Sequence, residues 1–128
     1  MSPGAARLRA PLLVTALLEL GVGLPCLLVP ALAADLLGLF PDAGLAVALR
    51  LFGAALLALA GLAWFAGRPQ AGPFVREAGM LLAGYHSLAA MVLWGGVVGG
   101  PLAPWVPGAA AVTHLVLAGW LFAGLSSR

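Results

Sequence analysis

Four long runs of apolar residues, separated by short polar turns, account for most of the chain. The runs cover 11–33, 45–66, 77–98 and 108–125, and each contains at most one acidic or basic residue. A helix of roughly 17–25 apolar residues spans a bilayer. Short connections place consecutive helices side by side and antiparallel. We therefore predict an all-α, antiparallel four-helix bundle that forms a single membrane domain over 1–128.

The first run is the least regular of the four, because Pro25 and Pro30 lie in its second half. Proline removes a backbone donor and bends or breaks a helix. One alternative is therefore a break near Pro30 followed by a short interfacial helix over 31–39. A second alternative is a signal peptide, because a basic start precedes the run and small residues follow at 31–34. The length of the run and the presence of Glu19 favour a retained helix.

Composition supports lipid as the solvent of this chain. Hydrophobic residues make up 63% and charged residues 8%, whereas about a quarter of the residues in soluble domains are charged. The few basic residues form no run, which excludes a nucleic-acid partner. A lone cysteine, Cys26, excludes an internal disulfide and a cysteine-based metal site.

The arginines outside the apolar runs predict the orientation. They fall on one side of the predicted bundle, whereas the opposite side carries Asp42; these arginines are Arg7, Arg9, Arg68, Arg76 and Arg128. The positive-inside rule places both termini in the cytoplasm. Abundant Ala, Gly, Leu, Val, Pro and Arg with no Lys or Asn is typical of a GC-rich bacterial genome. We predict a multi-pass protein of the bacterial inner membrane.

The candidate chemistry is one ionisable group within each helix: Glu19, Arg50, His86 and His114. Such groups are costly in lipid and usually face the protein interior with a partner. With a rise of ~1.5 Å per residue, Glu19 and His86 lie roughly 13 Å from the cytoplasmic face. Arg50 and His114 lie roughly 9–10 Å from the outer face. Small residues share the helix face of each group, so we predict a buried polar seam with a Glu19–Arg50 ion pair.

The two histidines admit other interpretations. His86 and His114 could ligate haem b from facing helices, but their predicted depths differ by about 6 Å, too much for two axial ligands. Each could instead be a hydrogen-bonded interior residue. The two histidines and Glu19 are suitable ligands for a divalent metal. They lack a local spacing such as His-x-x-x-His, so we predict no metal site.

Two overlapping small-residue motifs near the end of the third run form a candidate packing ridge of Gly95, Gly96, Gly99 and Gly100. Such a ridge can seat a neighbouring helix or subunit. A Gly-Pro turn follows directly, so loop flexibility explains these glycines equally well.

The order of these features resembles the DoxX-like group of small bacterial four-helix membrane proteins. The resemblance rests on Leu18–Gly23 around Glu19, Leu49–Leu59 around Arg50, Tyr85-His86, and Thr113-His114. It implies a membrane partner of other subunits, linked in some members to quinone-dependent sulfur oxidation. That activity would require a redox centre, and no redox motif is visible in this sequence.

We therefore predict a non-catalytic accessory or structural subunit of a larger inner-membrane complex, in contact with lipid and with other membrane subunits or further copies of itself. Two alternatives stay open. One is a redox membrane protein that binds haem b or quinone at His86 and His114. The other is a proton-coupled transporter of small molecules that uses Glu19. No phosphate loop, nucleophile elbow or dinucleotide fingerprint is present in the sequence, so no catalytic residue is predicted.

Overall fold

The computed structural model describes residues 3–100, 102 and 105–126, with side chains from residue 6 onward. These residues form helices and no strand: α1 (Pro3–Leu28), α2 (Pro30–Leu37), α3 (Ala43–Ala66), the short 3₁₀ helix η1 (Pro69–Ala71), α4 (Phe74–Val98) and α5 (Trp105–Ser126). Four of them, α1, α3, α4 and α5, are long and apolar enough to cross a membrane. The predicted all-helical fold with four apolar spans is confirmed. The cytoplasmic location of the termini stays a prediction, and Arg128, one of its arguments, lies outside the described residues.

A single first helix over 11–33 is wrong, and the alternative with a break at Pro30 is confirmed. α1 ends at Leu28, and Val29 leaves the helical region with φ −134° and ψ 62°. Proline disfavours helical geometry in the residue before it. The same proline is well suited to begin a helix, where its missing N–H is not needed. α2 therefore starts at Pro30 and ends before Gly38, whose φ of 74° provides a left-handed cap.

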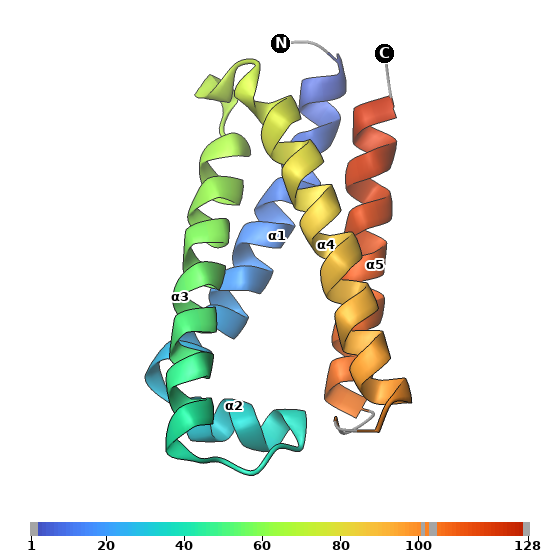
Figure 1. The fold of residues 1–128 in the computed structure, drawn as a ribbon. Helices are drawn as coiled ribbons and strands as arrows, with labels where there is room; N and C mark the ends of the chain where they lie inside the picture. Colours follow the sequence, from blue (N-terminus) through green and yellow to red (C-terminus); the bar gives the residue numbers. More distant parts are fainter. Residues whose placement is uncertain (1–2, 101, 103–104, 127–128) are drawn as a thin grey trace.

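The four long helices form two antiparallel hairpins. α1 packs along α3, and α4 packs along α5 (Figure 1). The described start of α1 and end of α5 lie at the same end of the bundle, here called the terminal end. α2 lies across the opposite end, here called the α2 end, where α3 and α4 have diverged (Figure 1).

The terminal end is filled by apolar side chains. Its buried core consists of Leu8, Leu12, Ala16, Ala63, Ala66, Val75, Ala78, Leu82, Ala83 and Leu121. Leu8 of α1 fits against glycines of the other hairpin, because a Cβ added at Gly124 would lie 2.8 Å from its Cδ2 atom. Arg76 in α4 donates a hydrogen bond to the backbone oxygen of Leu125 at 3.3 Å. The packing of Leu8 thus joins the two hairpins at this end, whereas the bond from Arg76 joins the two helices of one hairpin.

A pair of glycines brings α1 and α3 into backbone contact farther along the bundle. A Cβ added at Gly53 would lie 2.7 Å from the carbonyl oxygen of Gly23 and 2.7 Å from the amide nitrogen of Leu27. Small residues allow such close helix approach within a membrane. The hairpin of α1 and α3 thus stays tight toward the α2 end, and it is the separation between the two hairpins that widens.

Candidate functional site

Three of the four predicted polar residues meet between the two hairpins. Glu19 comes from α1, His86 from α4 and His114 from α5. Glu19 is 1% exposed, His86 is fully buried and His114 is partly buried. The Nδ1 atoms of the two histidines lie 2.6 Å apart, and Nδ1 of His86 lies 3.9 Å from Oε1 of Glu19. Together these residues form what is called here the polar cluster.

Two further side chains hold the polar cluster in place. The hydroxyl of Thr15, also buried, lies 2.9 Å from Nε2 of His86. Tyr85 donates a hydrogen bond from its hydroxyl to Oε2 of Glu19 at 3.1 Å. Its ring also meets the His114 ring edge-on, with centroids 5.8 Å apart. The sequence offers four possible hydrogen-bond partners for the histidines, Thr15, Tyr85, Ser87 and Thr113. Of these, only Thr15 bonds to a histidine, while Ser87 and Thr113 bond to carbonyl oxygens of their own helices. The bond from Tyr85 to Glu19 was missed, because contacts between α1 and α4 leave no local signal in the sequence.

Arg50 does not belong to the polar cluster. The predicted polar seam therefore does not include Arg50, and the predicted ion pair between Arg50 and Glu19 is wrong. Its side chain is exposed on α3. The buried face of α3 instead runs through Leu49, Gly53, Leu56 and Ala60. Consecutive residues of a helix are about 100° apart, so a buried face that runs through Leu49 and Gly53 leaves Arg50 at its side, out of contact with α1. The small residues beside Arg50 wrongly indicated an inward face, because alanine is abundant all around this helix.

The predicted difference in depth between His86 and His114 is also wrong, since their rings are in contact. The depth of His114 depends on where its helix begins. The sequence places that start at 108, but α5 begins at Trp105. The earlier start adds three residues, or about 4.5 Å along the helix axis, before His114. This shift removes most of the predicted separation.

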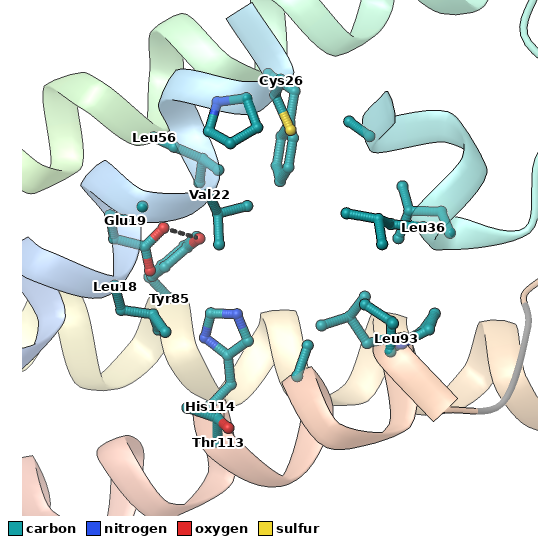
Figure 2. Close-up of a pocket in the computed structure, with 18 residues that line it drawn as sticks. Leu18, Glu19, Val22, Cys26, Leu36, Leu56, Tyr85, Leu93, Thr113 and His114 are labelled. Atoms are coloured by element: carbon teal, nitrogen blue, oxygen red, sulfur yellow. Dashed lines mark hydrogen bonds between the residues drawn. The ribbon is translucent and has the colours of Figure 1, made fainter. Parts of the chain in front are cut away.

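A pocket of about 260 Å³ adjoins the polar cluster on the side of the α2 end. All five α-helices contribute to its wall, which is mainly apolar (Figure 2). Its polar side chains are Glu19, Tyr85, Thr113 and His114. Figure 2 shows these four residues gathered on one side of the pocket, whereas Leu36 and Leu93 lie across from them. The pocket is therefore amphipathic, with one polar end.

Two atoms of the polar cluster, one oxygen and one nitrogen, form no hydrogen bond with the described residues. Oε1 of Glu19 is buried and accepts no hydrogen bond from them. Nε2 of His114 takes part in none of the hydrogen bonds that the described residues make, and the ring lines the pocket. A buried polar atom without a partner is unfavourable and calls for an explanation. Oε1 of Glu19 thus calls for a partner, and His114, which lines the pocket, offers a second atom that a bound group could reach.

Ligation of haem b by both histidines does not fit this arrangement. Two axial ligands approach the iron from opposite faces of the porphyrin, so the macrocycle would have to pass between them. The two Nδ1 atoms are only 2.6 Å apart, and the ring centroids are 4.9 Å apart. Moreover, His86 lies outside the pocket wall. No room exists between these imidazoles for a porphyrin.

The predicted glycine ridge seats no helix of this chain within the described residues. A Cβ added at Gly95 would meet nothing within 4 Å, whereas one at Gly96 would clash with the side chain of Leu102. Gly100 has a φ of 87° and supports the turn. The connection after α4 thus uses two of these glycines. A second subunit on Gly95 and Gly99 stays a prediction.

Comparisons with protein-family models, with curated proteins and with solved structures found no match for this chain.

Proposed function

We propose that this membrane protein binds a small lipid-soluble molecule of the quinone class in the pocket between its two hairpins. The observation that carries this proposal is the amphipathic character of the pocket. Apolar side chains surround most of a ligand there, while Glu19, Tyr85 and His114 gather at one end (Figure 2). Ligand sites in proteins typically combine an apolar wall with a few convergent polar groups.

The size of the pocket supports a single substituted ring. Pockets for drug-sized ligands measure roughly 300–1,000 Å³, and this one measures about 260 Å³. A ring with short substituents fits such a volume, and a longer apolar tail would extend past Leu36 and Leu93. The exposed apolar surfaces of the helices face lipid, which is the phase from which such a ligand would enter.

His114 can recognise both redox forms of a quinone. An imidazole with its proton on Nε2 donates a hydrogen bond, and one with its proton on Nδ1 accepts at Nε2. A quinone carbonyl accepts, whereas a hydroquinone hydroxyl donates. The hydrogen bond between the two Nδ1 atoms couples these states, because the histidine that donates it carries its proton on Nδ1 and the other histidine carries its proton on Nε2.

Binding alone requires no redox centre in this chain. The proposal therefore unites two predictions from the sequence, a quinone-binding protein and a subunit without its own catalytic site. In such an arrangement electrons would pass between the ligand and another subunit. The transporter hypothesis gains no support from the pocket, because packed leucines of the terminal-end core lie on the other side of Glu19.

A matched pair of variants tests the proposal. Ala110 lines the pocket, whereas the adjacent Ala109 is exposed. The purified protein in detergent is titrated with a short-chain benzoquinone and with an analogue of the same shape that lacks both carbonyl oxygens. We expect saturable binding of the quinone only, lost in Ala110→Phe and retained in Ala109→Phe. Equal binding of both compounds, or equal binding by both variants, would refute a quinone site in this pocket.

A further inference from the structure

We propose that Glu19, His86 and His114 together bind a divalent first-row transition-metal ion at the polar end of the pocket. This inference goes beyond quinone binding and does not depend on it. Each residue offers one ligand atom, and these three atoms all lie within 4.8 Å of one another. Two imidazoles and a carboxylate are a donor set that suits zinc and ferrous iron.

The distances in the polar cluster are close to those of a metal centre. Zn–N and Zn–O bonds of roughly 2.0–2.2 Å in a tetrahedron place ligand atoms about 3.3 Å apart. The distance from Nδ1 of His86 to Oε1 of Glu19 is 3.9 Å, and that between the two Nδ1 atoms is 2.6 Å. Small rotations of the side chains, less than 1 Å at each atom, bring both distances to the value that a metal requires.

One proton lies between the two histidines, and the metal would replace it. A hydrogen bond between two neutral imidazoles needs a proton on one Nδ1 and a lone pair on the other. When a metal binds, both Nδ1 atoms must present lone pairs. Each histidine then carries its single proton on Nε2, so the proton that joined the two rings moves to an Nε2 atom and the two imidazoles together release none. Metal binding is therefore coupled to a change of tautomer.

The surrounding hydrogen bonds already match those of a metal site. A histidine ligand usually donates its other ring N–H to a neighbouring acceptor, which fixes its orientation. Thr15 is placed to accept from Nε2 of His86 at 2.9 Å, which frees Nδ1 for a metal. Tyr85 occupies Oε2 of Glu19 and leaves Oε1 for the same ion. His86 and Glu19 are thus each held by a hydrogen bond through one polar atom, and the other polar atom is free to bind the ion.

The unpaired oxygen of Glu19 is an independent argument for a bound ion. Oε1 is buried without a hydrogen-bond partner among the described residues. A structural Glu–His pair would place the two groups within about 3.2 Å, but 3.9 Å separates them. This gap is too long for a hydrogen bond and suits two ligands of one ion. A metal would satisfy the oxygen that the protein leaves without a donor.

Three protein ligands leave one position for another group, as in catalytic zinc sites. Glu19 and His114 both line the pocket, whereas His86 lies behind them. The open position of the metal therefore faces the pocket. A divalent ion with one carboxylate keeps a net positive charge in an apolar environment. A hydroxide or another anionic oxygen at the fourth position would balance it.

Zinc titration of a Cys26→Ser background tests the proposal, because Cys26 also lines the pocket and its thiol could bind the ion. The protein carries no polyhistidine tag and is first treated with a chelator. We expect one Zn²⁺ per chain by calorimetry. Cobalt in place of zinc should give the visible absorption bands of a four-coordinate site.

The variants separate a metal site from a structural cluster. Glu19→Gln and His114→Ala should abolish saturable zinc binding, while Glu77→Gln, an exposed carboxylate of α4, should bind like the background protein. Thr15→Val keeps every ligand and should weaken binding by roughly 10–100-fold. Absence of saturable binding in the background protein would overturn the proposal, as would unchanged binding in Glu19→Gln and His114→Ala.

Two readouts keep the test decisive if the ligand variants fail to fold. Thr15→Val with unaltered zinc affinity, or cobalt binding without the absorption bands of a four-coordinate site, would also overturn the proposal. Quinone binding is measured on the chelator-treated protein. Failure of the metal site therefore leaves the quinone proposal standing, and the reverse also holds.

Discussion

Both ends of the bundle consist mainly of apolar residues, but one end is filled and the other contains a pocket. At the terminal end, leucines and alanines from α1, α3, α4 and α5 fill the space between the hairpins. At the α2 end, those hairpins diverge around a pocket of about 260 Å³ (Figures 1 and 2). The polar cluster lies at the boundary between the two ends, and α2 contributes to the wall of the pocket beyond it.

The physical reason lies in the spacing of the two hairpins, since all four long helices line the pocket. Four helices can enclose a filled core when each contributes a row of side chains. Near the α2 end, a short helix across the bundle replaces the continuation of α1 (Figure 1). Its residues Ala33, Leu36 and Leu37 reach the pocket wall but do not fill the interior. The break at Pro30 therefore places α2 across this end, where it closes the space that the diverging hairpins leave.

The largest expected effect concerns the close contact between α1 and α3. Gly53→Leu should destabilise the protein by about 3 kcal/mol, the upper part of the range for overpacking. The backbone atoms of Gly23 and Leu27 at 2.7 Å cannot rotate away from a new Cβ. Gly61→Leu on the same helix is the control, because nothing lies within 4 Å there. Unfolding in a denaturing detergent measures both variants, and similar values would contradict a tight contact between α1 and α3.

A pair of leucines compares the two ends directly. Leu12 is fully buried in the core of the terminal end, whereas Leu93 lines the pocket. Leu12→Ala should cost about 2 kcal/mol, the low end for such cavities, because lipid solvates apolar groups of separated helices. Leu93→Ala should cost less, since it only enlarges an existing space. Thermal melting followed by circular dichroism gives both values, and a larger loss for Leu93→Ala would reverse this comparison.

The boundary between the ends is tested by removing one hydroxyl. Tyr85→Phe should destabilise the protein by about 1 kcal/mol, because Oε2 of Glu19 loses its donor. Ser87→Ala is the matched control, since that hydroxyl bonds only within its own helix, to Ala83. If thermal melting shows equal stability for both variants, the bond from Tyr85 to Glu19 contributes nothing.

The smallest expected effect is at Arg50. Arg50→Gln should change stability by less than about 0.5 kcal/mol, as for other exposed positions. If this arginine were the buried partner of Glu19, its removal would cost about 3–5 kcal/mol. The same melting experiment therefore distinguishes the two locations of the guanidinium.

Much of the fold could be predicted from the apolar runs alone. Their length and spacing indicate four long helices, and proline chemistry at Pro30 indicates the short one. The candidate site could be predicted less well. Glu19, His86 and His114 stand out as ionisable groups in apolar helices, but Arg50 stands out equally. In a chain rich in alanine and glycine, small-residue faces do not distinguish an inward helix face from one exposed to lipid.

Local chemistry in the sequence determined the helices and the presence of costly polar groups within them. Tertiary structure alone decided which of those groups meet. The packing of α3 through Leu49 and Gly53 leaves Arg50 exposed, and the start of α5 at Trp105 brings His114 level with His86. Both depend on contacts between helices, where a shift of one residue turns a side chain by about 100°. No pattern along a single helix carries that information.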